Sequence, residues 1–329
     1  MRVGLIDVDG HNFPNLALMK ISAYHKAKGD DVEWCIPILP YDIVYQSKVF
    51  DDTYSKDINY IPIADKVIKG GTGYFRREED GTGYVYIRGI WVNIGSANSF
   101  TDGIETYNEF LPYDIEHIYP DYSLYPELTK NTAYGFLTRG CPRGCKFCIV
   151  AGKEGRRTFK VADLKEFWQE QKFIKLLDPN ILACREHIEL LEQLVNSKSY
   201  VDFTQGLDIR LTNERNIELI NLIKLKEIHF AWDNANDDLK PYFERYKALA
   251  KHKPHGHYGT VYCLTNFNST MEENLYRIYT LRDMGFNPYV MIYDKPNASK
   301  EIRYLQRWCN NKKIFRSCSR FEDFDHKKG

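Results

Sequence analysis

The first part of the chain alternates short apolar runs with one helical pattern. Residues 3–8 read VGLIDV, an apolar run typical of a buried strand. From residue 13 to residue 28, apolar side chains recur at the spacing of a helix face, and Gly29 stands where a helix commonly ends. Further short strands are predicted at residues 32–34, 43–45 and 66–69. This alternation predicts a doubly wound, Rossmann-like α/β domain.

A segment rich in proline and tyrosine follows at residues 111–128, which read LPYDIEHIYPDYSLYPEL. Its three prolines interrupt any helix, because proline lacks a backbone N–H and restricts the residue before it. We therefore predict a linker here and a domain boundary near residue 125. The two predicted domains comprise residues 1–125, with the linker, and residues 126–329, with a short C-terminal extension.

The second part of the chain repeats a strand–helix pattern. Strands are predicted at residues 134–138, 173–177, 200–204, 227–231, 258–264 and 289–293. Amphipathic helices are predicted between most of them, at residues 182–195, 213–223, 237–250 and 270–284. Strands that alternate with helices form a parallel sheet, and one unit per roughly 30 residues favours a partial (β/α)6 barrel over a flat sheet. Active sites in such folds lie at the carboxyl ends of the strands.

Charge and hydropathy narrow the class of protein. The 45 basic residues balance the 45 acidic residues, which argues against bulk electrostatic binding to nucleic acid or to an anionic membrane. No apolar run approaches the roughly 18 residues that span a membrane, and the N-terminus lacks the features of a signal peptide. We expect a cytoplasmic protein, in which the eight cysteines are thiols or metal ligands rather than disulfides.

Three cysteines lie in the stretch TRGCPRGCKFC, with the spacing C-x3-C-x2-C. Cys141, Cys145 and Cys148 follow the first predicted strand of the second domain, so they fall at the carboxyl rim of the predicted sheet. Thiolates at this spacing are typical ligands of an iron–sulfur cluster, and three ligands on a four-iron cluster leave one iron open. Gly140 and Gly144 allow the loop to fold tightly. The alternative is a non-catalytic binding protein stabilised by zinc or by an iron–sulfur cluster.

This motif, placed after the first strand of a six-unit β/α barrel, resembles the radical S-adenosylmethionine enzymes. The resemblance implies a [4Fe-4S] cluster on Cys141, Cys145 and Cys148, with S-adenosylmethionine on the fourth iron and Phe147 near the adenine. It implies an enzyme that cleaves S-adenosylmethionine reductively to a 5′-deoxyadenosyl radical, which removes a hydrogen atom from a substrate. It also implies an electron donor such as flavodoxin or ferredoxin.

Polar residues at the ends of later strands are candidate contacts to S-adenosylmethionine. Asp178 lies in LLDPN after the second predicted strand, and its alternative is an ordinary Asp-Pro-Asn turn. Gln205, Asp208 and Arg210 end the third strand; Arg210 is suited to a carboxylate, and its alternative is a salt bridge to Asp208. Asp233 ends the fourth strand. No residue is assigned a catalytic role, and Cys184, Cys309 and Cys318 are too scattered to predict a second cluster.

The order of the two domains resembles the branch of radical enzymes that carries a cobalamin-binding domain ahead of the barrel. The corresponding positions read Asp9-Gly-His11-Asn-Phe-Pro14, Ser47-Lys-Val49 and Gly70-Gly71. The resemblance implies His11 as a cobalt ligand held by Asp9. Pro14 and Val49 depart from the pattern. A bound cobalamin would make a cobalamin-dependent methyltransferase the alternative function, and a relative that has lost the cofactor is the other alternative.

Overall fold

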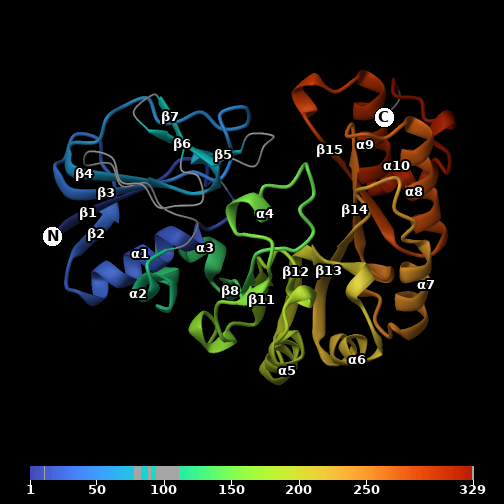
Figure 1. The fold of residues 1–329 in the computed structure, drawn as a ribbon, viewed down its shortest axis with the longest axis horizontal. Coiled ribbons are helices and arrows are strands. Elements are labelled where there is room, and N and C mark those ends of the chain that lie inside the picture. The colour runs from blue at the N-terminus through green and yellow to red at the C-terminus, as the bar shows by residue number, and fades with distance from the viewer. Residues whose placement is uncertain (11, 78–82, 88–89, 94–110, 328–329) are drawn as a thin grey trace. The chain divides into compact units, whose positions relative to one another are not determined.

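The computed structural model describes residues 1–10, 12–77, 83–87, 90–93 and 111–327. It is a mixed α/β protein with parallel sheets (Figure 1), and it divides into two compact units. The first unit contains Met1–Gly135, Gly140–Arg157 and Ala162–Gln171, and the second contains Phe136–Arg139, Thr158–Val161 and Lys172–Gly329. Within the described ranges, no helix combines the length and the apolar character needed to cross a membrane.

The first unit is built on a parallel sheet with the strand order β2-β1-β3-β4. Its strands are β1 (Arg2–Asp7), β2 (Asp31–Trp34), β3 (Tyr41–Ser47) and β4 (Ala64–Gly70), which confirms the strands predicted here. Helix α1 (Leu16–Ala27) begins where the Asn15 side chain accepts a hydrogen bond from the Leu18 N–H, 3.2 Å away. It ends just before Gly29, which adopts a φ of +79°.

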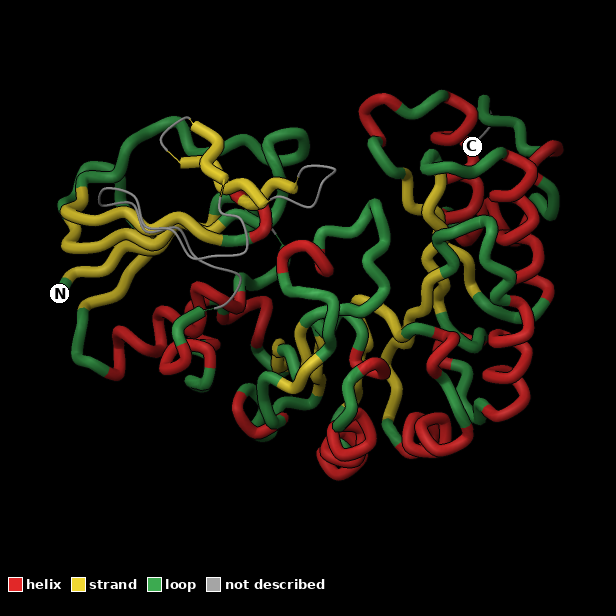
Figure 2. The backbone as a smooth tube through the Cα atoms, viewed as in Figure 1, coloured by secondary structure: helices red, strands yellow, loops and turns green. Residues whose placement is uncertain are grey.

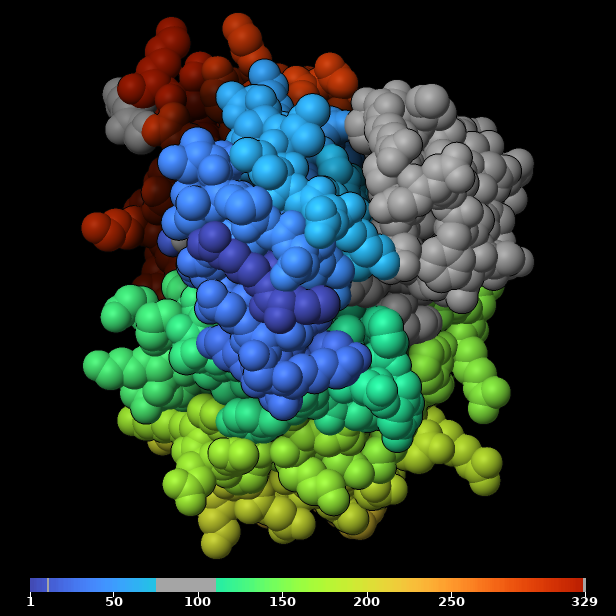
Figure 3. Space-filling model, turned by 90° about the vertical axis from the view of Figure 1, so that its left-hand side faces the viewer, coloured from blue at the N-terminus to red at the C-terminus, as the bar shows by residue number. Residues whose placement is uncertain are grey.

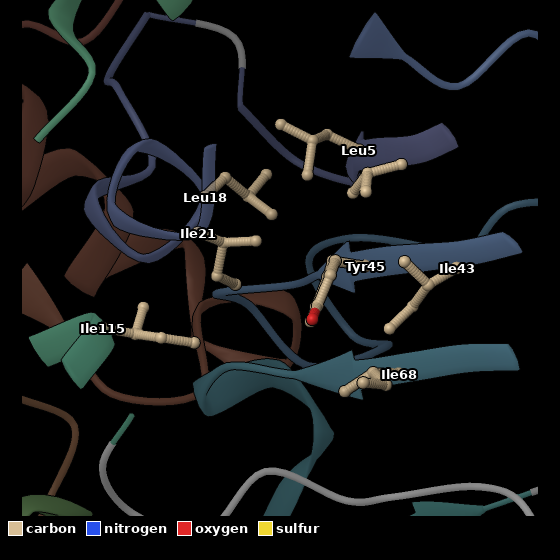
Figure 4. Close-up of a cluster of buried hydrophobic side chains, with 8 residues drawn as sticks. Leu5, Leu18, Ile21, Ile43, Tyr45, Ile68 and Ile115 are labelled. Atoms are coloured by element: carbon tan, nitrogen blue, oxygen red, sulfur yellow. The ribbon is translucent and has the colours of Figure 1, made fainter. Parts of the chain in front are cut away.

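The two faces of this sheet are covered differently. Figure 4 shows one face, where α1 and the short helix α2 (Tyr113–Glu116) pack on the strands. The apolar cluster there consists of Val3, Leu5, Leu18, Ile21, Ile43, Tyr45, Ile68 and Ile115. On the other face, loop residues such as Leu39 and Ile58 cover Ile6, Tyr41 and Val44. The β2–β3 and β3–β4 connections contain no helix, and Pro37, Pro40 and Pro62 disfavour one.

The remaining described part of the first unit consists of short elements. A small antiparallel sheet has the order β5-β6-β7, from β5 (Phe75–Arg77), β6 (Gly83–Ile87) and β7 (Ile90–Asn93) (Figure 2). Helix α3 (Pro126–Thr129), strand β8 (Thr132–Gly135) and helix α4 (Val150–Lys153) complete it. The first residues of the chain lie on the surface (Figure 3), where the Met1 amino group pairs with Asp30 at 2.9 Å.

Five parallel strands of one sheet lie in the second unit and neighbour one another in chain order. They are β11 (Phe173–Leu176), β12 (Tyr200–Leu207), β13 (Lys224–Ala231), β14 (Thr260–Thr265) and β15 (Asn287–Ile292). The helices between them are α5 (His187–Ser197), α6 (Glu214–Leu222), α7 (Lys240–Leu249) and α8 (Met271–Asp283). The five strands and four helices predicted for this region are confirmed, with shifts of a few residues at their ends.

The core of the second unit lies between the sheet and its helices. Figure 1 shows α5, α6, α7 and α8 on one side of the strands. The strand side chains on that side are apolar and buried: Ile174, Leu176, Val201, Phe203, Ile228, Phe230, Val261, Cys263 and Val290. At the β15 edge, Trp308 of α9 (Lys300–Asn310) is fully buried against Val290 and against Phe315 of α10 (Lys312–Ser317).

The strand predicted at residues 134–138 is divided in the structure. Strand β8 ends at Gly135, and a separate short strand, β9 (Thr138–Arg139), pairs antiparallel with β10 (Phe159–Lys160). The division has a physical cause, because the backbone N–H groups of Leu137 and Thr138 bond to a side chain, Asp178, instead of a neighbouring strand.

We predict that Gly71 is required for the packing of the first unit. It has a φ of +99°, and a Cβ atom there would lie 2.3 Å from the Lys48 carbonyl oxygen. Gly29 is the matched control, because its φ is +79° and nothing lies within 4 Å of its Cβ position. Gly29→Ala should cost about 1 kcal/mol of unfolding free energy, from backbone strain alone. Gly71→Ala should cost about 3 kcal/mol or more, because a contact with backbone is added.

Denaturant unfolding of the three proteins measures both costs. Equal losses in the two variants would contradict the close packing of residue 71 against the chain after β3.

Candidate functional site: the cysteine loop and the strand ends

The three cysteines lie on one loop, residues 140–158, whose base is a two-stranded ribbon. Strands β9 and β10 pair antiparallel with Arg139 opposite Phe159 and Thr138 opposite Lys160. The Val161 N–H adds a bond of 2.8 Å to the Leu137 carbonyl. The ribbon thus brings the two ends of the loop together, which limits the conformations open to the cysteines between them.

Hydrogen bonds within the loop hold its two arms against each other. The Gly140 N–H donates to the Glu154 carboxylate at 2.9 Å, and the Cys141 N–H donates to the Gly155 carbonyl at 3.2 Å. Gly140 adopts a φ of +77°, and a Cβ atom there would lie 2.1 Å from the Arg157 carbonyl oxygen. Only glycine satisfies both conditions, so the sequence expectation of a tightly folded loop is confirmed at Gly140.

The thiols of Cys141, Cys145 and Cys148 are all half-buried, as is Phe147. A turn links the last two cysteines, with the Cys148 N–H donating to the Cys145 carbonyl at 3.0 Å. All eight cysteines of the chain are thiols, and none forms a disulfide. In the part of the chain that the structure describes, no three His, Cys, Asp or Glu side chains form a group able to hold a metal ion.

The donor set nevertheless suits an iron–sulfur cluster. Three thiols on one short loop, accessible from solvent, are the ligand type that such clusters take. Metal binding commonly supplies the free energy that draws such ligands together. The residues that would hold the group are therefore Cys141, Cys145 and Cys148.

Asp178 has a structural role that the sequence did not reveal. It follows β11, it is 4% exposed, and its carboxylate accepts hydrogen bonds from the Leu137 N–H at 3.1 Å, the Thr138 N–H at 2.5 Å and the Thr138 hydroxyl at 2.7 Å. Asp178 therefore fixes the backbone just before the cysteine loop. Its predicted contact to S-adenosylmethionine stays a prediction, and any such contact has to share oxygens that already accept these bonds.

Burial dominates the ionisation of Asp178. Desolvation raises its pKa to about 6, although its hydrogen bonds to Thr138 and Leu137 lower the pKa. The same cause raises the pKa of Asp233 to about 6. Both carboxyl groups lie near strand ends. Their pKa values are closer to neutrality than the pKa of an exposed aspartate.

Asp208 and Arg210 are brought together at the end of β12. The Arg210 Nε donates to Asp208 Oδ1 at 2.7 Å, and its Nη1 donates to Asp237 Oδ2 at 3.0 Å. The salt bridge that was the alternative interpretation is therefore present. Gln205, two residues before the end of β12, is exposed. Contact of these three residues with a cofactor stays a prediction, and a carboxylate ligand at Arg210 would compete with two aspartates.

Asp233 follows β13, and its backbone carbonyl accepts a hydrogen bond from a buried arginine that the sequence did not reveal. Asp233 Oδ1 accepts a bond from the Leu264 N–H at 3.2 Å. Arg277 of α8 is 0% exposed and donates to the carbonyls of Trp232 at 2.6 Å, Asp233 at 2.9 Å and Leu264 at 2.9 Å. Arg277 thus ties the ends of β13 and β14 together. The burial of Arg277 could not be predicted from the helix pattern, because a charged helix residue normally faces solvent.

The residues proposed to bind cobalamin in the first unit form hydrogen bonds to other residues of this chain. The Asp9 carboxylate accepts the Val49 N–H at 3.0 Å and the Phe50 N–H at 2.7 Å, and the Ser47 hydroxyl accepts a bond of 2.7 Å from Asn15. Gly71 packs closely on the Lys48 carbonyl. His11 lies outside the described residues. The described members of the pattern therefore already accept hydrogen bonds from this chain, and cobalamin binding stays a prediction.

A scan against models of known protein families and a search of curated proteins find no match to this chain. Fold and site together define a mixed α/β protein with a three-cysteine loop that follows a strand end anchored by a buried carboxylate.

We predict a pH-dependent stability contribution from Asp178. Because its folded pKa of about 6 lies above its ordinary value of 3.8, the folded protein binds more protons than the unfolded chain between these values. The contribution of Asp178 is therefore fully present below about pH 4 and is lost as pH rises through 6. Relative to Asp178→Asn, wild-type stability should fall by about 2 kcal/mol between pH 4 and pH 7.

The measurement is the free energy of unfolding of both proteins across this range. A difference that stays constant, or that rises with pH, would show that the hydrogen bonds outweigh burial.

Proposed function

We propose that this chain is a radical S-adenosylmethionine enzyme, with a [4Fe-4S] cluster held by Cys141, Cys145 and Cys148. The observation that carries the proposal is the cysteine loop itself, with three thiols on one short segment closed at its base by the β9–β10 ribbon. When bound, the cluster supplies the electron for reductive cleavage of S-adenosylmethionine to a 5′-deoxyadenosyl radical, which takes a hydrogen atom from the substrate.

The fold supports the finer proposal of a partial (β/α)6 barrel. Five parallel strands follow one another in chain order, and the helices that connect them lie on one side. A β/α barrel is built from strands and helices in this arrangement. Its active site lies at the carboxyl ends of the strands. The first unit is then a Rossmann-like domain ahead of the barrel, whose described residues favour a relative without cobalamin.

The chain's own residues perform the following tasks in this proposal. Asp178 holds the backbone at Leu137 and Thr138, from which the loop departs. Glu154 and Gly140 hold the two arms of the loop together, so that the three thiols lie on a short span. Phe147 lies between Cys145 and Cys148 in the sequence and is half-buried. It is the proposed neighbour of the adenine. A cytoplasmic location and a flavodoxin- or ferredoxin-like electron donor complete the proposal.

We predict that Cys145→Ala abolishes cluster assembly, whereas Cys318→Ala leaves it intact. Cys318 is the matched control, because it is also a half-buried thiol but lies outside the loop. After anaerobic reconstitution with iron and sulfide, wild type and Cys318→Ala should each bind about four irons per chain, and Cys145→Ala should bind far less. Iron, sulfide and zinc analysis of the three proteins is the measurement.

Full iron in Cys145→Ala would show that the ligands are wrongly assigned. One zinc per chain in wild type, with no iron taken up, would support a zinc-stabilised binding protein instead.

A further inference from the structure

The first residues of three neighbouring strands of the second unit lie side by side. Phe173 begins β11, Tyr200 begins β12 and Lys224 begins β13. Tyr200 is paired with both of the others in the parallel register, so the three side chains leave the sheet on the same side. The centres of the Phe173 and Tyr200 rings are 5.8 Å apart. The amino ends of these strands therefore carry two adjacent aromatic rings.

Lysine side chains surround the two rings. The Lys226 Nζ lies 4.6 Å from the centre of the Phe173 ring, and the Lys172 Nζ lies 5.4 Å from it. The Lys224 Nζ lies 5.9 Å from the centre of the Tyr200 ring. Because ammonium groups are attracted to aromatic rings, the rings gather three positive charges in a small area. We call these five residues the strand-start patch: Lys172, Phe173, Tyr200, Lys224 and Lys226.

The lysines of the strand-start patch have no anionic partner within the described chain. All three are exposed, and none of them forms an ion pair with a described residue. Glu227, which follows Lys226 on β13, has its carboxylate 3.3 Å from the His255 Nε2 instead. Positive charges that lie close together repel one another, so the binding of an anion among them is favourable.

The exposed lysines continue beyond β13. The loop after α7 is attached to the end of α6, because the Lys251 N–H donates to the Asn221 Oδ1 at 2.8 Å. Asn221 comes shortly before Lys224 in the chain, so Lys251 lies close to the amino end of β13. Lys251 and Lys253 are also exposed and form no ion pair with a described residue. Positive charge thus extends from β11 to the loop before β14, which suits a chain of phosphates.

An exposed aromatic ring among the lysines favours single-stranded nucleic acid over other polyanions. Tyr200 is 41% exposed. The bases of a single strand stack on such rings while its phosphates contact lysines. An acidic peptide contacts the lysines but has no base to stack, and a duplex already stacks its bases on one another. The balanced net charge of the chain weakens attraction at long range only, because salt screens exposed charges beyond roughly 10 Å.

We propose that the strand-start patch binds single-stranded nucleic acid, with its lysines in contact with phosphates and a base stacked on Tyr200. This site goes beyond the proposed function, because it contains none of the three cysteines of the loop. Binding is measured without iron or sulfide. The failure of this proposal and the failure of the proposed cluster are therefore distinguishable.

The test is the binding of fluorescent single strands to the full chain, followed by fluorescence anisotropy at several salt concentrations. The probes are oligouridine and oligothymidine of about ten nucleotides each, which is within the site size of small single-strand-binding domains. At least one should bind with a dissociation constant of about 100 µM or tighter near 0.1 M salt. Tighter binding of one probe assigns the patch to RNA or to DNA.

Salt dependence and variants locate the contacts. Each phosphate contact contributes a slope of about −0.7 to the logarithm of the binding constant against that of the salt concentration, so the three lysines predict about −2. Replacing two of them, by Lys224→Gln with Lys226→Gln, should weaken binding about tenfold and leave a slope of about −0.7. The matched control is Lys295→Gln with Lys300→Gln, which removes two exposed lysines beyond the carboxyl end of β15 and should bind as wild type does.

The stacking contact has a separate signature. Tyr200→Leu should weaken binding about fivefold and leave the salt slope unchanged, because stacking involves no counterion. An abasic strand of equal length should bind wild type about fivefold more weakly than oligouridine or oligothymidine, since it offers phosphates without bases. Circular dichroism of each variant shows that it folds, and the two sets of substitutions test the patch independently.

Four outcomes would overturn the proposal. The first is equal binding of the abasic strand, and the second is tighter binding of a polyglutamate peptide, which would point to an acidic protein. The third is unchanged binding in both the folded lysine variant and folded Tyr200→Leu. The fourth is no binding of either oligonucleotide at about 1 mM protein.

Discussion

A single buried carboxylate fixes the backbone from which the cysteine loop departs. Asp178 accepts the N–H groups of Leu137 and Thr138 and the Thr138 hydroxyl, and it has almost no contact with solvent. These bonds replace the strand pairing that the backbone would otherwise make, so the chain leaves the strand direction there and enters the β9–β10 ribbon. The place of the three cysteines follows from this constraint, because the ribbon closes the loop that carries them.

The second unit separates packing from chemistry on the two sides of one sheet. Its helix side holds the apolar core, which ends in the buried Trp308 at the β15 edge. The opposite side of the sheet carries Asp202, Glu227 and His229, which packing does not require. Arg277 lies in helix α8, yet it bonds the carbonyls at the ends of β13 and β14. A core that fixes the strands so firmly allows the strand ends to carry buried charges such as Asp233.

Much of this fold could be predicted from the sequence, because its strands and helices follow simple periods. The capping box at Thr270 and Glu273, which begins α8, was visible in the same way. The covering of the first sheet was harder to predict, since residues such as Leu39 and Ile58 pack from loops without any periodic signal. The division of the strand at residues 134–138 depends on a side chain about 40 positions away, which no local pattern records.

The candidate site could be predicted in part. The spacing of the cysteines identified the loop, but the roles of Asp178 and Arg277 arise from tertiary contacts. The polar side of the second sheet did have a signal, because Glu227 and His229 alternate with Ile228 and Phe230, as polar and apolar residues alternate on a strand with one polar side. When a strand is predicted from its apolar residues alone, the polar residues between them are easily overlooked.

We propose above all that the cysteine loop supports reductive cleavage of S-adenosylmethionine. The most direct measurement is made without oxygen: wild-type protein is reconstituted with iron and sulfide, reduced, and mixed with S-adenosylmethionine, and 5′-deoxyadenosine is sought by mass spectrometry. We predict that 5′-deoxyadenosine forms, and that it forms only when the protein and the reductant are both present. Protein that binds zinc in place of iron and yields no 5′-deoxyadenosine would contradict it.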